Sequence, residues 1–400
     1  MRDGTQRIAR IQQALQDTSL DALVCALPAN VLLLSGYWPV VGTSIAAATR
    51  TGRIAVLAPE DEAKLATKGW ANTVRTFEPD SLTRLTSVAE AAREPLAALL
   101  QDLDLTQAHI GYEEGESYEV VTYPAMHLYG SAMADLLWAA APKATQRSGA
   151  EALPPLRSAL VPDEVERVRA ACRVAEAAFR VGAQAICAGQ TEAEVAAQFA
   201  APLSVDGLTY PDVTRAGGFV YCMSGPRSAQ AGGAYARSSS RTLQEGDLVL
   251  VHCNSYVDGY WIDITRTYCL GEPDERQRAM YAAIEAARVA ALTTLAPGVR
   301  AADVDGAARD ALTRCGFGAD FTHGVGHNVG FSAISMQYPP RLHPASPDLL
   351  APGMTFNIEP AIYIQGYGGM RHCDVVTLGE AGPVVLTPFR GELDQLIIRL

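Results

Sequence analysis

The stretch VHCNSYVDGYWIDITRTY, residues 251–268, constrains the fold of this chain more than any other. Two runs rich in β-branched and aromatic residues flank Asp258-Gly259, a pair that favours a tight two-residue hairpin turn. With that turn, His252 lies diagonally across from Asp263 on the same face of the hairpin. The sequence therefore predicts an imidazole beside a carboxylate on a rigid face. The pair could form a metal site or an acid/base pair, or have neither function.

The first third of the chain alternates helical and strand patterns, which is typical of a small α/β domain. The predicted helices are RIARIQQALQ and SVAEAAREPLAALLQDL, and the predicted strands are DALVCAL, RIAVLAP and HIGYE. We also expect ANVLLLSGY to enter a strand. APKATQRSGAEALPPLRSALVPDE is rich in Pro, Ala and Ser and lacks strong periodicity, so we place the domains at residues 1–155 and 156–400.

The second domain interleaves helices with antiparallel strands, which indicates an α+β class rather than a doubly wound sheet. The predicted helices are DEVERVRAACRVAEAAFRVGAQAI, EAEVAAQFAAPL, ERQRAMYAAIEAARVAALTTL and AADVDGAARDALTRCG. A Gly/Ser-rich loop is expected before the hairpin, and MTFNIEPAIYI, GGMRHCDVVTLG and VVLTPF are expected as closing strands. The chain has no GxGxxG followed by a helix and no GxxxxGK[ST], so nothing indicates a nucleotide site.

The charge pattern excludes several classes of partner. The net charge is −12 and the basic residues are scattered, which argues against nucleic acid and against an anionic membrane surface. No apolar run reaches the roughly 20 residues that span a bilayer. The N-terminal MRDGTQRIARIQQALQ is typical of an amphipathic helix rather than a signal peptide. Eight cysteines without a CxxC pair are expected as reduced thiols, so we predict a cytoplasmic protein.

Several further segments supply side chains able to bind a metal or move a proton. His323 and His327 lie in FTHGVGHNVGF, where two intervening glycines disfavour a helix and allow close approach to a ligand. Glu359 lies within the apolar FNIEPAIYI, and a buried carboxylate needs a cation, a metal or a hydrogen-bond donor. Arg371 and Cys373 share one face of GGMRHCDVV by strand alternation. A lone buried His or Cys is more often a packed group, so the functional case rests on the whole set.

The order of these motifs resembles the pita-bread fold family. The matching stretches are GDLVLVHCNSYVDGYWIDITRTYCLG, FTHGVGHNVGF, GMTFNIEPAIYI and GGMRHCDVVTL. That family holds Xaa-Pro aminopeptidases, prolidases, methionine aminopeptidases and the metal-free creatinases. DALVCALPANVLLLSGY is similar to the small α/β domain that precedes the catalytic domain in creatinases and prolidases. The resemblance implies an α+β pita-bread catalytic domain, a homodimer, and a small-molecule or short-peptide substrate.

The metallopeptidases of this family bind two divalent cations through two Asp, one His and two Glu. The resemblance places Asp263, His327 and Glu359 at three of these five positions. His252 stands in the place of the first aspartate, and Cys373 stands in the place of the second, bridging glutamate. The chain is thus expected to be an atypical member in which two of the five ligand positions are replaced.

These replacements change which metal the site suits. Losing two carboxylates removes negative charge and an oxygen bridge. The remaining ligands would therefore compensate poorly for the charge of two hard cations such as Mn²⁺. The remaining nitrogen, oxygen and sulfur donors suit one divalent transition metal, Zn²⁺ or Fe²⁺ rather than Mn²⁺, and they are His252, Asp263, His327, Glu359 and Cys373. We therefore expect a hydrolase of an amide, peptide or amidine-type C–N bond with an atypical mononuclear metal site.

Catalytic roles follow from the same comparison. His323 and Glu359 are expected as acid/base or orienting groups, and Arg371 is expected to orient the site or neutralise developing charge. A metal-free, creatinase-like C–N hydrolase remains open. So does an Xaa-Pro dipeptidase or aminopeptidase, although Ile334 falls where the family peptidases carry a histidine. A lyase or other non-hydrolytic enzyme and an inactive peptide-binding module complete the alternatives; the surviving titratable groups argue against the last.

Overall fold

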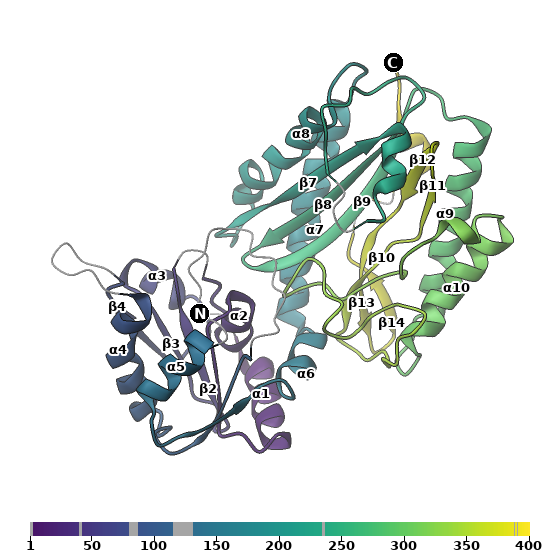
Figure 1. Ribbon diagram of the computed structural model, residues 1–400. Coiled ribbons are helices and arrows are strands. Elements are labelled where there is room, and N and C mark those ends of the chain that lie inside the picture. Colours follow the sequence, from purple (N-terminus) through teal and green to yellow (C-terminus); the bar gives the residue numbers. More distant parts are fainter. Residues whose placement is uncertain are drawn as a thin grey trace. The chain divides into compact units, whose positions relative to one another are not determined.

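The computed structural model describes residues 3–39, 42–79, 87–114, 131–233, 237–387, 389 and 391–400. The chain divides into two compact units, Met1–Arg157 and Ser158–Leu400 (Figure 1). Among the helices built from the described residues, none is long and apolar enough to cross a membrane.

The first unit is built on a six-stranded mixed sheet with the order β4-β3-β2-β1-β5-β6. Its strands are β1 (Ala22–Cys25), β2 (Ile45–Thr49), β3 (Ile54–Pro59), β4 (Thr73–Phe77), β5 (His109–Tyr112) and β6 (Thr145–Ser148). Its helices are α1 (Thr5–Asp17), α2 (Pro28–Ser35), α3 (Ala63–Ala66), α4 (Val88–Asp102) and α5 (Ser131–Ala140), and α6 (Leu153–Ser158) ends it. The predicted helices and strands of this unit are present with one exception, and β2, β4 and β6 were not predicted.

One predicted strand of the first unit is wrong, because ANVLLLSGY forms the helix α2. Every residue from Ala29 to Ser35 is buried, so the run carries no period that distinguishes a helix from a strand. Pro28 fits the first turn, where its missing N–H has no partner to lose, and Gly36 ends the helix with a φ of 70°. The Glu113 carboxylate accepts hydrogen bonds at the start of this helix.

The second unit holds three sheets, with the orders β15-β9-β8-β7, β10-β13-β14 and β11-β12. Its strands are β7 (Ala216–Ser224), β8 (Leu248–Val257), β9 (Tyr260–Leu270), β10 (Thr355–Ile358), β11 (Ala361–Ile364), β12 (Gly368–Arg371), β13 (Asp374–Gly379), β14 (Gly382–Val385) and β15 (Ile397–Ile398). Its long helices are α7 (Pro162–Gln184), α8 (Glu192–Val205), α9 (Glu275–Thr294) and α10 (Ala301–Arg314). Helices α7 and α8 pack on the β7–β9 sheet, and α9 and α10 pack on each other beside β10–β12 (Figure 1).

The predicted hairpin is confirmed in type, turn and register. Strands β8 and β9 are antiparallel, with Val257 opposite Tyr260. Asp258 and Gly259 have φ values of 49° and 87°, the positive values that a type I′ turn requires at both central positions. The expected loop before the hairpin contains an unpredicted strand, β7, which pairs along β8.

Two segments predicted as single strands are each interrupted at a site residue. Glu359 and Pro360 separate β10 from β11, because proline has no N–H to continue a ladder. His372 and Cys373 separate β12 from β13, and the Cys373 N–H donates to the Thr265 carbonyl of β9 at 3.1 Å. The second interruption thus ties the backbone to the hairpin, whereas the Glu359 N–H donates to the Val325 carbonyl at 2.8 Å.

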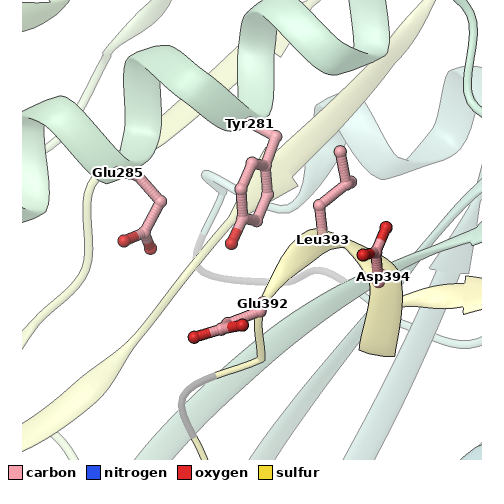
Figure 2. A pocket seen from close by; sticks show the side chains of 5 residues that line it. All are labelled: Tyr281, Glu285, Glu392, Leu393 and Asp394. Carbon is pink, nitrogen blue, oxygen red and sulfur yellow. The ribbon is translucent and has the colours of Figure 1, made fainter.

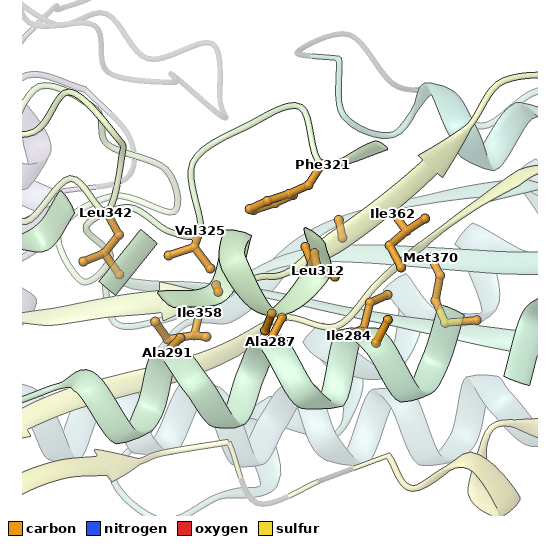
Figure 3. Close-up of a cluster of buried hydrophobic side chains, with 14 of the residues drawn as sticks. Ile284, Ala287, Ala291, Leu312, Phe321, Val325, Leu342, Ile358, Ile362 and Met370 are labelled. Carbon is orange, nitrogen blue, oxygen red and sulfur yellow. The ribbon is translucent and has the colours of Figure 1, made fainter. Parts of the chain in front are cut away.

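An apolar layer between α9 and the short strands fixes these segments. Ile284, Ala287 and Ala291 follow one face of α9 at helical spacing and pack toward Ile358 of β10 (Figure 3). These side chains are almost fully buried in one hydrophobic cluster. The cluster holds β10 in place, and with it the backbone of the adjacent Glu359.

Candidate metal centre

Three of the five expected ligands come together in the second unit. Asp263 lies on β9, His327 on the loop before β10, and Glu359 at the break between β10 and β11. Within the described part of the chain, one ligand atom of each lies within 4.8 Å of the other two. His327 Nε2 lies 3.5 Å from Asp263 Oδ2 and 3.6 Å from Glu359 Oε1. One imidazole nitrogen and two carboxylate oxygens form a donor set that fits a divalent transition metal.

Backbone contacts hold His327 in this orientation. The loop approaches β10 so closely that a Cβ on Gly326 would lie 2.0 Å from the Asn357 carbonyl oxygen, so glycine is required. The Asn357 side chain accepts from the His327 N–H at 2.7 Å, which turns its Nδ2 toward His327 Nε2 at 3.0 Å. His327 Nδ1–H donates to the Asn328 carbonyl at 3.1 Å. Nε2 is therefore the ring nitrogen without a fixed hydrogen, and it faces Asn357 Nδ2 and the two carboxylate oxygens, the orientation of many metal-ligating histidines.

The electrostatics of this group favour a positive charge. Burial alone would lower the pKa of His327, but the hydrogen bond to Asp263 and the charge of Glu359 outweigh it and raise the pKa above the ordinary value. Burial likewise opposes ionisation of Asp263, yet the neighbouring His252 and His327 lower the pKa of that carboxyl group. A proton or a metal ion between these side chains satisfies both carboxylates.

His252 lies beside this group rather than within it. Its Nδ1 is 3.3 Å from Asp263 Oδ1, on the far side of that carboxylate from His327, and 2.7 Å from Nη2 of Arg371. Because a guanidinium can only donate, Nδ1 accepts and the ring hydrogen is on Nε2. Burial lowers the pKa of His252, and Arg371 lowers it further against the opposing charge of Asp263. His252 is thus a neutral imidazole whose single lone pair Arg371 occupies.

Cys373 also borders the group. Its Sγ lies 3.1 Å from the Asp263 carbonyl oxygen and 4.0 Å from Asp263 Oδ1. Burial raises the pKa of the thiol well above its ordinary value, and the charges of Asp263 and Glu359 raise it further. The side chain is therefore a neutral thiol that donates to a main-chain carbonyl. Its role as a ligand stays a prediction, because coordination requires the thiolate.

A buried ion network supports the backbone of Cys373 from behind. The Arg266 side chain donates to the Cys373 carbonyl at 2.6 Å and to Asp374 at 2.7 Å. Arg288 Nε donates to the other oxygen of Asp374 at 2.6 Å. These cations lower the pKa of Asp374 even though burial opposes its ionisation. The network fixes the segment between β12 and β13 that carries Cys373.

The predicted catalytic residues occupy two places. Arg371 reaches the metal group directly, since its Nη1 lies 3.7 Å from Glu359 Oε2 and its Nε donates to Thr265 Oγ1 at 3.1 Å. His323 lies apart and donates from Nδ1 to the Gly324 carbonyl at 2.8 Å. Its Nε2 therefore accepts from the Tyr363 hydroxyl, 3.1 Å away. Burial lowers the pKa of His323, which keeps this imidazole neutral at pH 7.

The residues around the group that sequence reasoning missed are Thr265, Asn357 and Tyr363. Tyr363 could have been predicted from the sequence, because it follows Glu359 by four residues and so shares its face in an extended segment. Burial raises the pKa of Tyr363 to about 12, so its hydroxyl keeps its proton. Asn357 could be found in the same way, two residues before Glu359.

A pocket elsewhere in the second unit gathers carboxylates but none of the predicted site residues. It is lined by Tyr281, Glu285, Glu392, Leu393 and Asp394 (Figure 2). His372 faces this side, with Nδ1 3.7 Å from Glu285 Oε1. His372 therefore points away from the face that Arg371 and Cys373 share.

Comparisons with known proteins agree with this geometry. Residues 166–380 match the model of metallopeptidase family M24. The "probable dipeptidase PepE" of Mycobacterium tuberculosis is 39% identical over 197 residues, which cover 49% of each chain. The "Xaa-Pro dipeptidase" of Pyrococcus furiosus is 33% identical over 238 residues, which cover 60% of this chain and 65% of that one. The chain thus spans about half to two thirds of the curated relatives it matches.

Solved structures match over almost the whole chain. The dipeptidase PepE of Mycobacterium ulcerans has a TM-score of 0.72 and 26% identity, covering 99% of this chain and 98% of that one. The prolidase of Pyrococcus horikoshii has a TM-score of 0.75 and 24% identity, covering 97% and 99%. These likenesses confirm the predicted fold, a pita-bread domain after a smaller N-terminal domain. Because the family model matches more than half of the residues of this chain, the chain belongs to metallopeptidase family M24.

Proposed function

We propose that the protein hydrolyses a C–N bond of a peptide or small amide with one divalent transition metal, Zn²⁺ or Fe²⁺ rather than Mn²⁺. The observation that carries this proposal is the convergence of Asp263, His327 and Glu359 within 4.8 Å. Cys373 is a candidate fourth ligand, because metal binding lowers the pKa of a thiol that lies 4.0 Å from Asp263 Oδ1.

The residues present do not fit a second metal. That ion would need donors on the Oδ1 side of Asp263, where the structure places His252 and Cys373. His252 is neutral and its lone pair accepts from Arg371, so it brings neither a charge nor a free donor atom. Two divalent cations would then share too few anionic ligands.

Each side chain of the site has a chemical task in this proposal. A bound divalent metal supplies Lewis acidity and a lowered pKa for a coordinated water. Once the neutral His323 takes up a proton at Nε2, that N–H can donate to the Tyr363 hydroxyl oxygen, and the hydroxyl hydrogen is then free for a substrate oxygen. The Arg371 guanidinium stabilises negative charge that develops on the substrate close to Glu359.

Metal analysis together with an amidase and dipeptidase assay tests the proposal. We expect about one equivalent of Zn or Fe per chain and activity that is lost on chelation and restored by adding the metal. The Glu359→Gln variant should lose both metal and activity, since it replaces a charged ligand by a neutral one of equal size. Full activity of metal-free protein in chelator contradicts the proposal and favours the creatinase-like route. Unchanged function in Glu359→Gln favours a binding module.

An Xaa-Pro dipeptidase is the second candidate. It is favoured by the relatives that carry that name, among them the Pyrococcus furiosus protein at 33% identity. Against it stands Ile334, 45% exposed where the family peptidases carry a histidine. Robust turnover of Xaa-Pro dipeptides with added Mn²⁺ or Co²⁺, and none of other amides, decides for this candidate. The proposed hydrolase is also a homodimer, as the family resemblance implies, and cytoplasmic, as the pattern of its cysteines predicts.

A further inference from the structure

Asn254 carries a buried amide donor that the proposed chemistry does not use. It lies on β8, two residues after His252 and directly opposite Asp263 on β9. All three side chains therefore share the face of the hairpin that bears the metal group. Among the described residues, no hydrogen-bond partner lies within reach of the buried Asn254 Nδ2. A buried donor without a partner is costly, so its retention calls for an explanation.

The orientation of this amide is set by its neighbours. Arg371 donates to His252 Nδ1 at 2.7 Å, so the ring hydrogen of His252 must be on Nε2. The His252 Nε2 atom lies 3.3 Å from Asn254 Oδ1, and because it carries the hydrogen it can only donate to that oxygen. A flipped amide would place a donor against a donor. The chain of hydrogen bonds from Arg371 through His252 thus leaves the NH₂ group of Asn254 as the free end.

Two aromatic side chains of β7 lie beside Asn254, and one of them is exposed to solvent. Phe219 on β7 lies directly opposite Asn254, so both side chains are on the same face, and Phe219 is 38% exposed. Tyr221 stacks on His252 with ring centroids 6.3 Å apart. An exposed and a stacked aromatic ring beside an amide donor form a surface on which an apolar peptide side chain can pack.

We propose that Asn254 Nδ2 donates a hydrogen bond to an acceptor oxygen of the bound peptide substrate, at a subsite beside Asp263. The oxygen is the scissile carbonyl or the C-terminal carboxylate, two groups that an amide N–H recognises equally. His252 acts as a positioning residue, because its Nε2–H holds the amide in the orientation that presents the donor. The proposal rests on the proposed function, since it assigns a substrate contact to that site.

Two variants separate binding from structure. Asn254→Asp keeps an oxygen for the His252 Nε2–H, replaces the donor by a second oxygen and adds a negative charge, whereas Asn254→Ala removes both groups. The probes are Ala-Pro and its reduced-amide analogue, which keeps the carboxylate, lacks the scissile carbonyl and is not cleaved. Zn²⁺-loaded protein is used for calorimetric binding of the analogue and for steady-state cleavage of Ala-Pro. Zn²⁺ affinity of Asn254→Ala is measured in parallel.

We expect Asn254→Ala to weaken substrate recognition roughly three- to tenfold, the effect of one neutral hydrogen bond, and Asn254→Asp to weaken it at least as much. Weaker binding of the analogue assigns the carboxylate as the acceptor. Unchanged binding of the analogue with a lower kcat/KM for Ala-Pro assigns the carbonyl. Zn²⁺ affinity should stay within about twofold of the parent protein, because Asn254 is not a ligand.

Three results overturn the assignment. In the first, Asn254→Asp recognises both probes as well as the parent protein does, so only the contact with His252 matters. In the second, Asn254→Ala loses Zn²⁺ in proportion to its loss of substrate recognition, which indicates a structural role. In the third, the parent protein neither binds the analogue nor cleaves Ala-Pro. If the parent protein binds the analogue but cleaves no peptide, the proposed hydrolase is contradicted. The role of Asn254 can still be tested in that case, because the affinity of its variants for the analogue can be measured.

Discussion

Arg371 Nη2 lies 2.7 Å from Nδ1 of His252, and in the proposed function this hydrogen bond limits the site to one cation. A carboxylate at position 252 has two oxygens with about four lone-pair sites, so it can accept from a guanidinium and still coordinate a metal. An imidazole has one lone pair in its ring plane. Once Arg371 occupies that lone pair, the Oδ1 side of Asp263 lacks a ligand.

Restoring both missing carboxylates should restore a second metal. We expect the His252→Asp/Cys373→Glu double variant to bind two equivalents of Mn²⁺ per chain, and we expect the parent protein to bind one equivalent of Zn²⁺ or Fe²⁺. Metal content after dialysis and calorimetric titration measure the stoichiometry. A single equivalent in the double variant means that something other than these two side chains limits the site.

Metal affinity should depend on pH through His327. Its pKa is raised in the folded protein, so below that pKa a metal ion must displace a proton from the imidazole. We expect Zn²⁺ affinity to rise about tenfold per pH unit up to the raised pKa of His327, and to level off above it. In the metal-free protein the sign is opposite. The His327 proton stabilises the fold below about pH 6.5, the ordinary histidine value, and this contribution is lost as the pH rises through the raised pKa.

Calorimetric titrations of Zn²⁺ at several pH values measure this dependence, with the buffer's own proton uptake subtracted. The His327→Gln variant is the control, because it removes the titrating group and should flatten the pH profile while weakening binding overall. Equal affinity of the parent protein at all pH values contradicts the placement of His327 in the metal group.

Cys373 should resist alkylation. Its thiol is buried and its raised pKa keeps it protonated, whereas Cys187 and Cys315 are exposed. We expect iodoacetamide at about pH 8 to modify Cys187 and Cys315 and to leave Cys373 intact until the protein unfolds. Peptide mass spectrometry after short labelling times measures the three rates side by side. Labelling of Cys373 as fast as of the exposed cysteines contradicts a buried neutral thiol.

Asp374 should matter for stability more than any exposed acidic residue. The Asp374→Asn variant leaves the buried cations of Arg266 and Arg288 without their anion, and we expect the free energy of unfolding to fall by about 3–5 kcal/mol. Asp303→Asn is the matched control, because Asp303 pairs with Arg300 at the exposed surface. The control should change stability by no more than about 0.5 kcal/mol. Urea denaturation measures the free energy of unfolding of both variants. Equal losses in the two variants would contradict a stabilising role of the buried network.

Much of the candidate site could be predicted because its determinants are local. The hairpin register follows from Asp258 and Gly259, whose turn preference does not depend on the rest of the chain. The sequence could not show the hydrogen bonding of His252, because its partner Arg371 lies 119 residues away. Helix α2 was missed because burial on all sides leaves its residues without a period, and strand β7 because Gly217 and Gly218 weaken the strand pattern.

The tight turn at Asp258 and Gly259 has a consequence for engineering. Because both positive φ angles fix the register, β8 cannot slide against β9 to accommodate a new side chain. The backbone at positions 252, 254 and 263 therefore stays in place when the side chains at these positions are substituted. A designer who wants a different metal or a different substrate can vary two residues of one strand and leave the scaffold alone.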